Sequence, residues 1–304
     1  MRALPLSAMR AFEAAARTGS FRAAAVSLSL TPSAVSHAIR GLERQIGAPL
    51  FARDGRSVRL TVEGETLMTH VERGFGELRH GLLSVSTRGP TLLRLHCAPS
   101  FAAQWLVPRL PQLLGRRGGL ELRLAAGTDY TRFVADEFDA DIVYGAPEPK
   151  AYGPRGHEGI VILPLIEETV TPLCCPAMAP RITSVAALLD HPLIESDNKK
   201  IRWDAWFKAN GMVAPAPHGP RFDRSFFSLS AAADGLGVAL ESTLLAEREL
   251  LSGRLVRPLL GRCQDVTYIG HHLVFPRGLS HSRGLRLFLD WLLAELGLPG
   301  RAPP

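Results

Sequence analysis

The chain has 304 residues, of which 46% are hydrophobic and 21% charged, and its formal net charge is +6 at pH 7. This length favours two or more domains, and the composition is ordinary for a soluble globular protein. No apolar run reaches the roughly 18 residues that a membrane span needs, and the N-terminal segment lacks an apolar secretory region. We therefore expect neither a membrane protein nor an exported one.

The excess charge is confined to the first 60 residues. They hold nine arginines and no lysine against Glu13, Glu43 and Asp54, a net charge of +6, so the other 244 residues balance at 26 basic and 26 acidic side chains. A small basic head on a neutral body predicts that a polyanion binds at the head alone.

Capping residues mark out the helices of this head. Gly19 can end a helix over residues 6–17 in the left-handed conformation, and Ser20 can cap the next helix, over residues 21–28. Thr31 is a good N-cap for a third helix, and Pro32 falls at its first position, where a missing N–H is harmless. The pattern predicts two short helices joined by a tight turn.

The third helix has two different faces. Apolar residues recur at spacings of four, three and four, which predicts one buried stripe. The stripe consists of Val35, Ile39, Leu42 and Ile46. The opposite face carries Ser33, Ser36, His37 and Arg40. Such short or flexible hydrogen-bonding groups near a helix N-terminus suit a helix in a major groove, with phosphates at its amino end and base edges along its side.

An arginine-bearing hairpin follows this helix. Leu50 and Phe51 are expected to fill the small core, and Asp54-Gly55 supplies the turn. The hairpin carries Arg53, Arg56 and Arg59. Beside a recognition helix these arginines suit phosphate or minor-groove contacts. The alternative is an alanine-rich helix pair with solvated arginines, but the agreement of caps, stripe, hairpin and charge favours DNA binding.

Stretches of this head match a known family in both sequence and spacing. They are TPSAVSHAIRGLE at 31–43, IGAPLFAR at 46–53 and LTVEG at 60–64. They closely resemble the winged helix-turn-helix of LysR-type transcriptional regulators. We expect DNA to be contacted by Thr31, Ser33, Ala34, Ser36, His37, Arg40, Arg53 and Arg56.

Residues 61–89 predict a linker helix with an unpartnered apolar seam. The seam residues, at close to helical spacing, are Val62, Leu67, Val71, Phe75, Leu78, Leu82 and Val85. A seam outside a core needs a partner, so we interpret the segment as a dimerisation helix. The alternative is a helix docked on its own domain, and Gly74, Gly76 and Gly81 disfavour a long coiled coil. Residues 87–90 then break the helix as a hinge.

Beyond Pro90, strands alternate with helices, which predicts a parallel sheet with helices on both faces. We expect strands at 92–98, 120–126 and 140–145, with helical regions at 101–114 and 131–138 between them. Near residue 165 the chain is expected to cross into a second lobe. That lobe is predicted to hold a strand at 169–175, a helix at 184–190 and a helix–turn–strand unit at 225–242. Residues 266–275 then return to the first lobe, and residues 282–296 close it as a helix.

This body resembles the effector-binding domain of the same family, which is similar to periplasmic solute-binding proteins. The matching phrases are PSFAAQWLVPRL (99–110), ADIVYG (140–145), FDRS (222–225), AAADGLGVAL (231–240) and GRLVRPL (253–259). They look like the branch that includes the glycine-cleavage and β-lactamase regulators.

The expected fold class is α/β with a winged helix-turn-helix over 1–60, a linker helix over 61–89 and an effector-binding domain over 90–304. That last domain is two-lobed and doubly wound. Lobe I is expected at about 90–164 and 266–304, and lobe II at about 165–265.

Ligands of open α/β sheets lie beyond the carboxyl ends of strands, facing helix N-termini. Ser100 follows the first strand of the body and opens a helix, so its hydroxyl and the free amides can hold a carboxylate. Thr128 follows the second strand, and Ser225 opens the long helix of lobe II. The family resemblance places effector contacts at these positions and also at Phe101 and Tyr268. The alternative is that Ser100 and Ser225 are plain N-caps.

Catalytic motifs are missing from the sequence: GxSxG, HExxH, GxxxxGK[ST] and GxGxxG do not occur. The adjacent pairs His271–His272 and Cys174–Cys175 point to opposite faces of a strand, which is poor geometry for one metal. We expect no cofactor, no metal and reduced cysteines. The alternative function is a small-molecule-binding enzyme or a solute-binding-type protein with an accessory nucleic-acid-binding head. It would need a nucleophile, an acid–base pair or an export signal.

The sequence thus predicts a cytosolic regulator that acts as a homodimer or homotetramer. Paired heads would bind a dyad-symmetric operator, and a small molecule between the lobes would bias their arrangement. The family resemblance adds RNA polymerase as a further partner.

Overall fold

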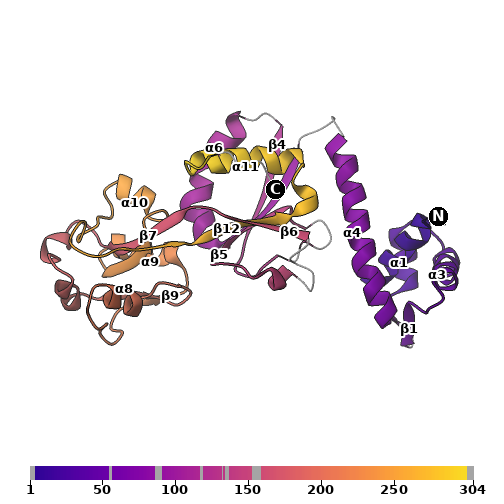
Figure 1. Ribbon diagram of the computed structural model, residues 1–304, viewed down its shortest axis with the longest axis horizontal. Helices are drawn as coiled ribbons and strands as arrows, with labels where there is room; N and C mark the ends of the chain where they lie inside the picture. The colour runs from indigo at the N-terminus through magenta and orange to yellow at the C-terminus, as the bar shows by residue number, and fades with distance from the viewer. Residues whose placement is uncertain are drawn as a thin grey trace. The chain divides into compact units, whose positions relative to one another are not determined.

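The computed structural model describes residues 4–54, 57–85, 91–116, 119–131, 133, 137–152 and 159–299. The chain divides into two compact units, Met1–Val85 and Ser86–Pro304 (Figure 1). Within the described ranges, no helix is both long and apolar enough to cross a membrane.

The first unit, called the head below, is a helical cluster followed by a hairpin and a long helix. Its elements are α1 (Leu6–Thr18), α2 (Phe21–Ser27), α3 (Pro32–Ile46), β1 (Phe51–Asp54), β2 (Ser57–Leu60) and α4 (Val62–Val85). The predicted caps are confirmed. Gly19 ends α1 with a φ of 62°, the Ser20 hydroxyl accepts from the Ala23 amide, and the Thr31 hydroxyl accepts from the Ala34 amide at 3.2 Å.

Small side chains let the helices of the head pack closely. Ala11, Ala15, Ala24 and Ala25 are buried together with Val35 and Ile39 of α3. A second cluster joins α1, α3, the hairpin and α4 and contains Phe12, Leu42, Leu50, Met68 and Val71. The predicted stripe of α3 is wrong at its last member, because Ile46 is 46% exposed. The helix ends there at Gly47, beyond the reach of the core.

The apolar seam of α4 is divided between two environments. Val71 is buried against the head, and Leu67 and Phe75 pack against the same cluster. Leu78 and Leu82, further along the helix, are 53% and 71% exposed. The middle of α4 therefore docks on its own unit, and its C-terminal part leaves an apolar edge uncovered.

The second unit, called the body below, begins with lobe I. Its sheet has the order β4-β3-β5-β12-β6. The strands are β3 (Thr91–Cys97), β4 (Leu120–Ala126), β5 (Ala140–Tyr144), β6 (Ile160–Pro164) and β12 (His271–Pro276). An unbroken helical run follows β3 and consists of α5 (Pro99–Phe101), a π-helical turn (Ala102–Leu106) and α6 (Val107–Arg116). The C-terminal helix α11 (Arg283–Glu295) lies against β3 (Figure 1).

Lobe II is built on a second sheet, with the order β11-β7-β10-β8-β9. Its strands are β7 (Glu167–Leu173), β8 (Leu193–Ser196), β9 (Arg221–Phe222), β10 (Val238–Ser242) and β11 (Val266–Ile269). Its helices are α8 (Trp203–Ala209), α9 (Ser225–Ala233) and α10 (Glu247–Leu251). Trp203, Trp206 and Phe207 of α8 are buried in the lobe II core.

Both sheets are mixed, whereas the alternating pattern predicts a parallel one. β3 runs parallel to β4 and β5, but β12 is antiparallel to β5 and β6. In lobe II, β10 is parallel to β8 and antiparallel to β7. Each of these antiparallel pairs contains β7 or β12, the strands that follow a crossing between the lobes.

The chain crosses between the lobes at Leu165 and Ile166 and again at Gly270. β11 pairs with β7 in lobe II, so the return to lobe I comes after residue 269 and not at 266 as expected. The segment expected as a helix at 184–190 is a 3-10 turn at Ala186–Asp190. Of the helix expected at 131–138, the described residues 131, 133, 137 and 138 are not helical, and the rest lies outside the described residues.

Candidate functional site

The outer face of α3 is free of the head's core. Thr31, Ser33, Ala34, His37 and Arg40 are exposed and Ser36 is half-buried. The cap orders the start of this face, since the Thr31 hydroxyl also lies 3.0 Å from the Ser33 hydroxyl. The buried stripe therefore fixes which way the polar residues point, and the N-terminal turn of α3 presents them to solvent.

The hairpin is held by groups that the sequence reasoning did not single out. The Glu43 carboxylate of α3 accepts hydrogen bonds from the amides of Leu50 and Phe51, at 2.8 and 3.3 Å. The Thr61 amide donates to the Leu50 carbonyl at 3.0 Å. A Cβ on Gly64 would lie 2.2 Å from that same carbonyl oxygen, so only glycine lets α4 approach this closely.

Two of the predicted hairpin contacts cannot be placed. Arg53 belongs to β1, but its side chain is outside the described residues, as is Arg56 altogether. The backbone of β1 and β2 is described and pairs antiparallel, with Arg53 opposite Val58.

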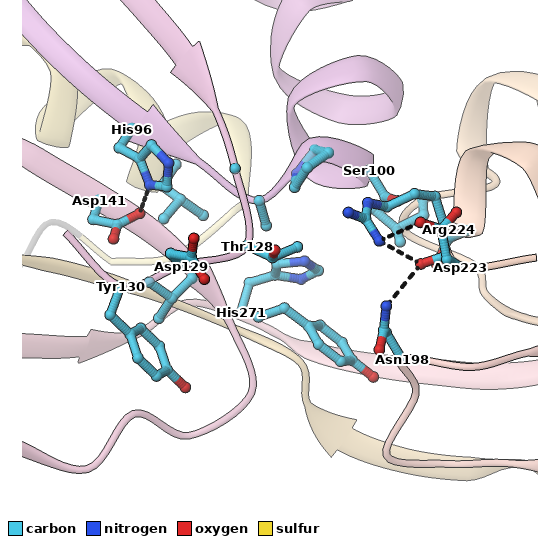
Figure 2. Close-up of a pocket in the computed structure, with 18 of the residues that line it drawn as sticks. His96, Ser100, Thr128, Asp129, Tyr130, Asp141, Asn198, Asp223, Arg224 and His271 are labelled. Atoms are coloured by element: carbon cyan, nitrogen blue, oxygen red, sulfur yellow. Dashed lines mark hydrogen bonds and ion pairs between the residues drawn. The ribbon is translucent and has the colours of Figure 1, made fainter. Parts of the chain in front are cut away.

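A cavity of about 280 Å³ lies between the two lobes of the body (Figure 2). Lobe I contributes residues after the carboxyl ends of β3, β4 and β5, and lobe II contributes residues around β8 and the start of α9. The structure brings together three of the predicted effector residues, Ser100, Thr128 and Ser225, on its wall.

Phe101 and Tyr268 do not line this cavity, contrary to expectation. The Phe101 side chain is fully buried, and its ring packs at 4.7 Å from the ring of His271, which does line the cavity. Tyr268 donates its hydroxyl to the Tyr144 hydroxyl at 2.9 Å, and Tyr144 is on the wall. Both residues thus lie one layer behind the surface that a ligand would touch.

Ser100 and Ser225 are not N-caps, so that alternative is wrong. The caps are Ala98 and Arg224, and neither makes a side-chain capping hydrogen bond. Ser100 and Ser225 sit inside the first turn, where backbone amides lack intrahelical acceptors. The two helices begin at the cavity wall from opposite lobes.

Below the loop that carries Thr128, a buried ion pair joins neighbouring strands. His96 Nδ1 of β3 lies 2.9 Å from Asp141 Oδ1 of β5, and Asp141 Oδ2 accepts from the Thr131 amide at 3.1 Å. The hydrogen bond to Asp141 raises the pKa of His96, against the opposing effect of burial. A Cβ on Gly127 would lie 2.6 Å from His96 Nε2, so the loop rests directly on this imidazole.

A second set of buried charges lies at the crossing between the lobes. His271 Nδ1 of β12 is 2.5 Å from Glu168 Oε1 of β7, with both side chains almost fully buried. Lys199 pairs with Glu241 of β10 and also donates to the Leu240 carbonyl at 2.9 Å. Burial raises the pKa of Glu241, and the Lys199 ammonium opposes that shift. Burial lowers the pKa of the neighbouring His272.

The described part of the chain shows neither a metal site nor a reactive thiol. No group of His, Cys, Asp and Glu side chains there could hold a metal ion. Burial raises the pKa of the Cys97 thiol and raises that of Cys174 to about 12, which leaves these thiols protonated.

The head has the fold and the exposed helix face of a DNA-binding unit, and the body has an interlobe cavity of ligand-binding type. Together they define a ligand-responsive DNA-binding regulator.

Comparison with known proteins identifies the family. The model described as "Bacterial regulatory helix-turn-helix protein, lysR family" matches residues 6–65, and that described as "LysR substrate binding domain" matches residues 88–297. The chain belongs to the LysR family of transcriptional regulators. It is a sequence-specific DNA-binding regulator with an effector-binding domain, and not an enzyme.

Individual relatives agree with this assignment. The uncharacterized HTH-type transcriptional regulator y4mQ of Sinorhizobium fredii is 55% identical over 95% of each chain. The HTH-type transcriptional regulator PerR of Escherichia coli K12 is 49% identical over 97% of this chain and 96% of its own. The solved effector domain of AmpR from Pseudomonas aeruginosa has 30% identity and a TM-score of 0.55, and the match covers 68% of this chain and 96% of that one. AmpR and the glycine cleavage system transcriptional activator are both among the relatives, which confirms the expected branch.

Proposed function

We propose that the outer face of α3 reads base edges in the major groove of an operator. The assigned residues are Thr31, Ser33, Ala34, Ser36, His37 and Arg40, with Arg53 and Arg56 of the hairpin on phosphates or in the minor groove. One observation carries the proposal: Val35, Ile39 and Leu42 are buried while His37 and Arg40 of the same helix are exposed. A helix anchored along one side in this way can enter a groove with the other side.

The proposed control of DNA binding uses the cavity of the body. A small molecule contacting Ser100 and Thr128 of lobe I and Ser225 of lobe II would favour one arrangement of the lobes. Phe101 and Tyr268 support the wall from behind. The ligand must prefer one arrangement, because equal affinity for both shifts no equilibrium.

The proposal includes self-association in the cytoplasm. Leu78 and Leu82 leave an apolar edge on α4 that a second copy can cover. A dimer or tetramer would place heads on adjacent half-sites and raise affinity through effective concentration. RNA polymerase is the further partner that such a regulator would engage.

The DNA contacts are tested with two arginine variants and a matched control. Arg40→Ala should cost about 1–3 kcal/mol on the operator and relax discrimination between operator and unrelated duplex. Arg53→Ala should weaken binding to all sequences and flatten the slope of log affinity against log salt by about one unit. Arg262→Ala removes an exposed arginine of the body and should change neither property.

The measurement is fluorescence anisotropy across salt concentrations, on fragments first recovered by genome-wide mapping of bound sites. If Arg40→Ala and Arg53→Ala behave alike, the division between base and phosphate contacts is wrong. If the unaltered protein shows no salt-sensitive affinity for any duplex, with or without candidate metabolites, the DNA-binding proposal is wrong as a whole.

A further inference from the structure

Most charged side chains on or directly behind the cavity wall are already paired with each other. These pairs are His96–Asp141, Arg224–Asp223 and His271–Glu168. A charge that is already paired with an opposite charge attracts a ligand only weakly, because the two electrostatic potentials largely cancel. The chemistry of the ligand is therefore set by the groups that remain unmatched, and these lie in two places.

The first unmatched group is the carboxylate of Asp129. It follows Thr128 in the loop after β4 and lines the cavity. Among the described residues, no side chain makes a hydrogen bond or an ion pair with it. Figure 2 shows Asp129 beside Thr128, on the side of the cavity away from Arg224 and Ser100. A ligand cation placed here would meet a carboxylate that no side chain holds in a hydrogen bond, although its charge also acts on the nearby His96 imidazole.

The second unmatched set consists of backbone donors. The helical run from Pro99 to Arg116 and the nine-residue helix α9 both begin at the cavity without a capping side chain. The amides of Ser100, Phe101, Ser225 and Phe226 lie in these first turns. Uncapped amides at a helix N-terminus bind anions, because the donors and the helix dipole act together. Here two such ends come from opposite lobes.

The ring of His271 lies on the floor of the cavity, between the two unmatched places. Its side chain is 2% exposed and its ring lines the cavity. Nδ1 is committed to the Glu168 carboxylate, so the ring offers Nε2, which has no partner among the described residues. Figure 2 shows the ring between Thr128 and Asn198, in the middle of the wall.

The size of the cavity limits the ligand. At about 280 Å³ it lies just below the roughly 300–1,000 Å³ of pockets for drug-sized ligands. A free amino acid or a dipeptide fits within this volume.

We propose that the effector is a small zwitterion, the size of an amino acid or a dipeptide. Its carboxylate is held by the amides of Ser100 and Ser225, and its ammonium group binds Asp129. This inference rests on the proposed interlobe effector site. A dicarboxylate would place a negative charge against Asp129, and a simple amine would leave the helix ends without an anion, so neither satisfies both places.

The test uses the full-length protein and three matched sets of probes. Free L- and D-amino acids and dipeptides are screened by thermal shift, and each binder is then titrated calorimetrically beside its N-acetyl and C-amide derivatives. N-acetylation removes the ammonium and amidation removes the carboxylate. We expect free zwitterions to raise Tm, and each derivative to bind at least tenfold more weakly than its parent.

Two variants test which residue binds which end of the ligand. Asp129→Asn should weaken the parent at least tenfold and bring the affinity ratio of parent to N-acetyl derivative close to one. Ser225→Pro removes an amide donor at the first position of α9, where proline is tolerated and Arg224 has the extended conformation that precedes it well. It should bring the ratio of parent to C-amide close to one, whereas Ser225→Ala, which removes only the hydroxyl, should retain that ratio.

Asp190→Asn, an exposed carboxylate of lobe II away from the cavity, is the matched control and should bind like the unaltered protein. The inference is overturned if no zwitterion binds, if the derivatives bind as well as their parents, or if Asp129→Asn leaves the ratio unchanged. Dicarboxylates or amines are screened in parallel. If one of them binds instead and Ser225→Pro weakens it, the cavity remains the effector site and only the zwitterion class is wrong.

Discussion

The head and the body use charged residues in opposite ways. Among the described residues of the head, Glu13 is the sole buried charge, and Arg40 of the DNA-binding face is exposed. The body carries 24 basic and 22 acidic side chains, a net charge of only +2, yet it buries Asp141, Glu168, Glu195, Glu241 and Glu249. Exposed charges act at long range and are screened by salt, whereas buried pairs act locally and are not. Net charge therefore reports what the head binds, and says nothing about the charges that hold the body together.

The largest effect should come from breaking a buried pair in the body. Lys199→Met leaves the fully buried Glu241 carboxylate without its cation, which should lower the free energy of unfolding of the body by about 3–5 kcal/mol. All four tryptophans lie in the body, so urea unfolding followed by tryptophan fluorescence reads this unit alone.

The control for that variant removes both charges. Lys199→Met with Glu241→Leu should be more stable than Lys199→Met alone, since no charge is left buried and unpaired. A loss that does not recover in the double variant would mean that the Lys199 side chain matters for packing and not for its charge.

A smaller effect is expected from the backbone packing of the head. Gly64→Ala places a Cβ against the Leu50 carbonyl and should destabilise the head by about 1–3 kcal/mol. Gly74→Ala on the same helix meets open space and should instead stabilise it by about 0.5–1 kcal/mol. Melting followed by circular dichroism measures both, with tryptophan fluorescence showing an unchanged body. Equal effects of the two substitutions would contradict the close contact.

Local features of the head were predictable from sequence because the residues that cause them are adjacent in the chain. Gly19, Ser20 and Thr31 each act within one helical turn, and the structure confirms all three caps. The exposed Ile46 shows the limit of periodicity. The apolar spacing can continue to the last residue of a helix even where the core no longer covers it. Similarly, the spacing along α4 could not show that Leu78 and Leu82 near its C-terminal end stay exposed while Val71 packs against the head.

The body was predictable in outline and not in its pairings. Strand positions follow from apolar runs, but the antiparallel course of β12 depends on where the chain crosses between lobes, which no local pattern encodes. The Lys199–Glu241 pair joins residues 42 apart, and Glu168 meets His271 over 103 residues. The positions of Ser100, Thr128 and Ser225 at the cavity could be predicted, because ligands bind where strands end and helices begin. That Asp129 has no side-chain hydrogen bond could not be predicted, because it depends on which residues the fold brings near it.

The smallest destabilisation we expect comes from changing His96, and its dependence on pH separates charge from packing. The pKa of His96 is raised above 6.5 by Asp141, so its contribution to stability is fully present below pH 6.5 and is lost as pH rises through the raised value. His96→Gln should therefore destabilise the body by about 1–2 kcal/mol at pH 6 and by less at pH 9, as read by tryptophan fluorescence in urea.

His272 changes the stability of the body with pH in the opposite direction, and it does so in a lower pH range. Its pKa is lowered below 6.5, so the stability linked to it is present above pH 6.5 and is lost as pH falls through the lowered value. His272 is present in both proteins, so its effect cancels when the variant is compared with the unaltered protein at the same pH. The same destabilisation by His96→Gln at pH 6 and pH 9 would show that the imidazole supports Gly127 and its loop by shape alone. A loss that fades with rising pH would show that the charge of the buried pair holds the loop that carries Thr128 and Asp129.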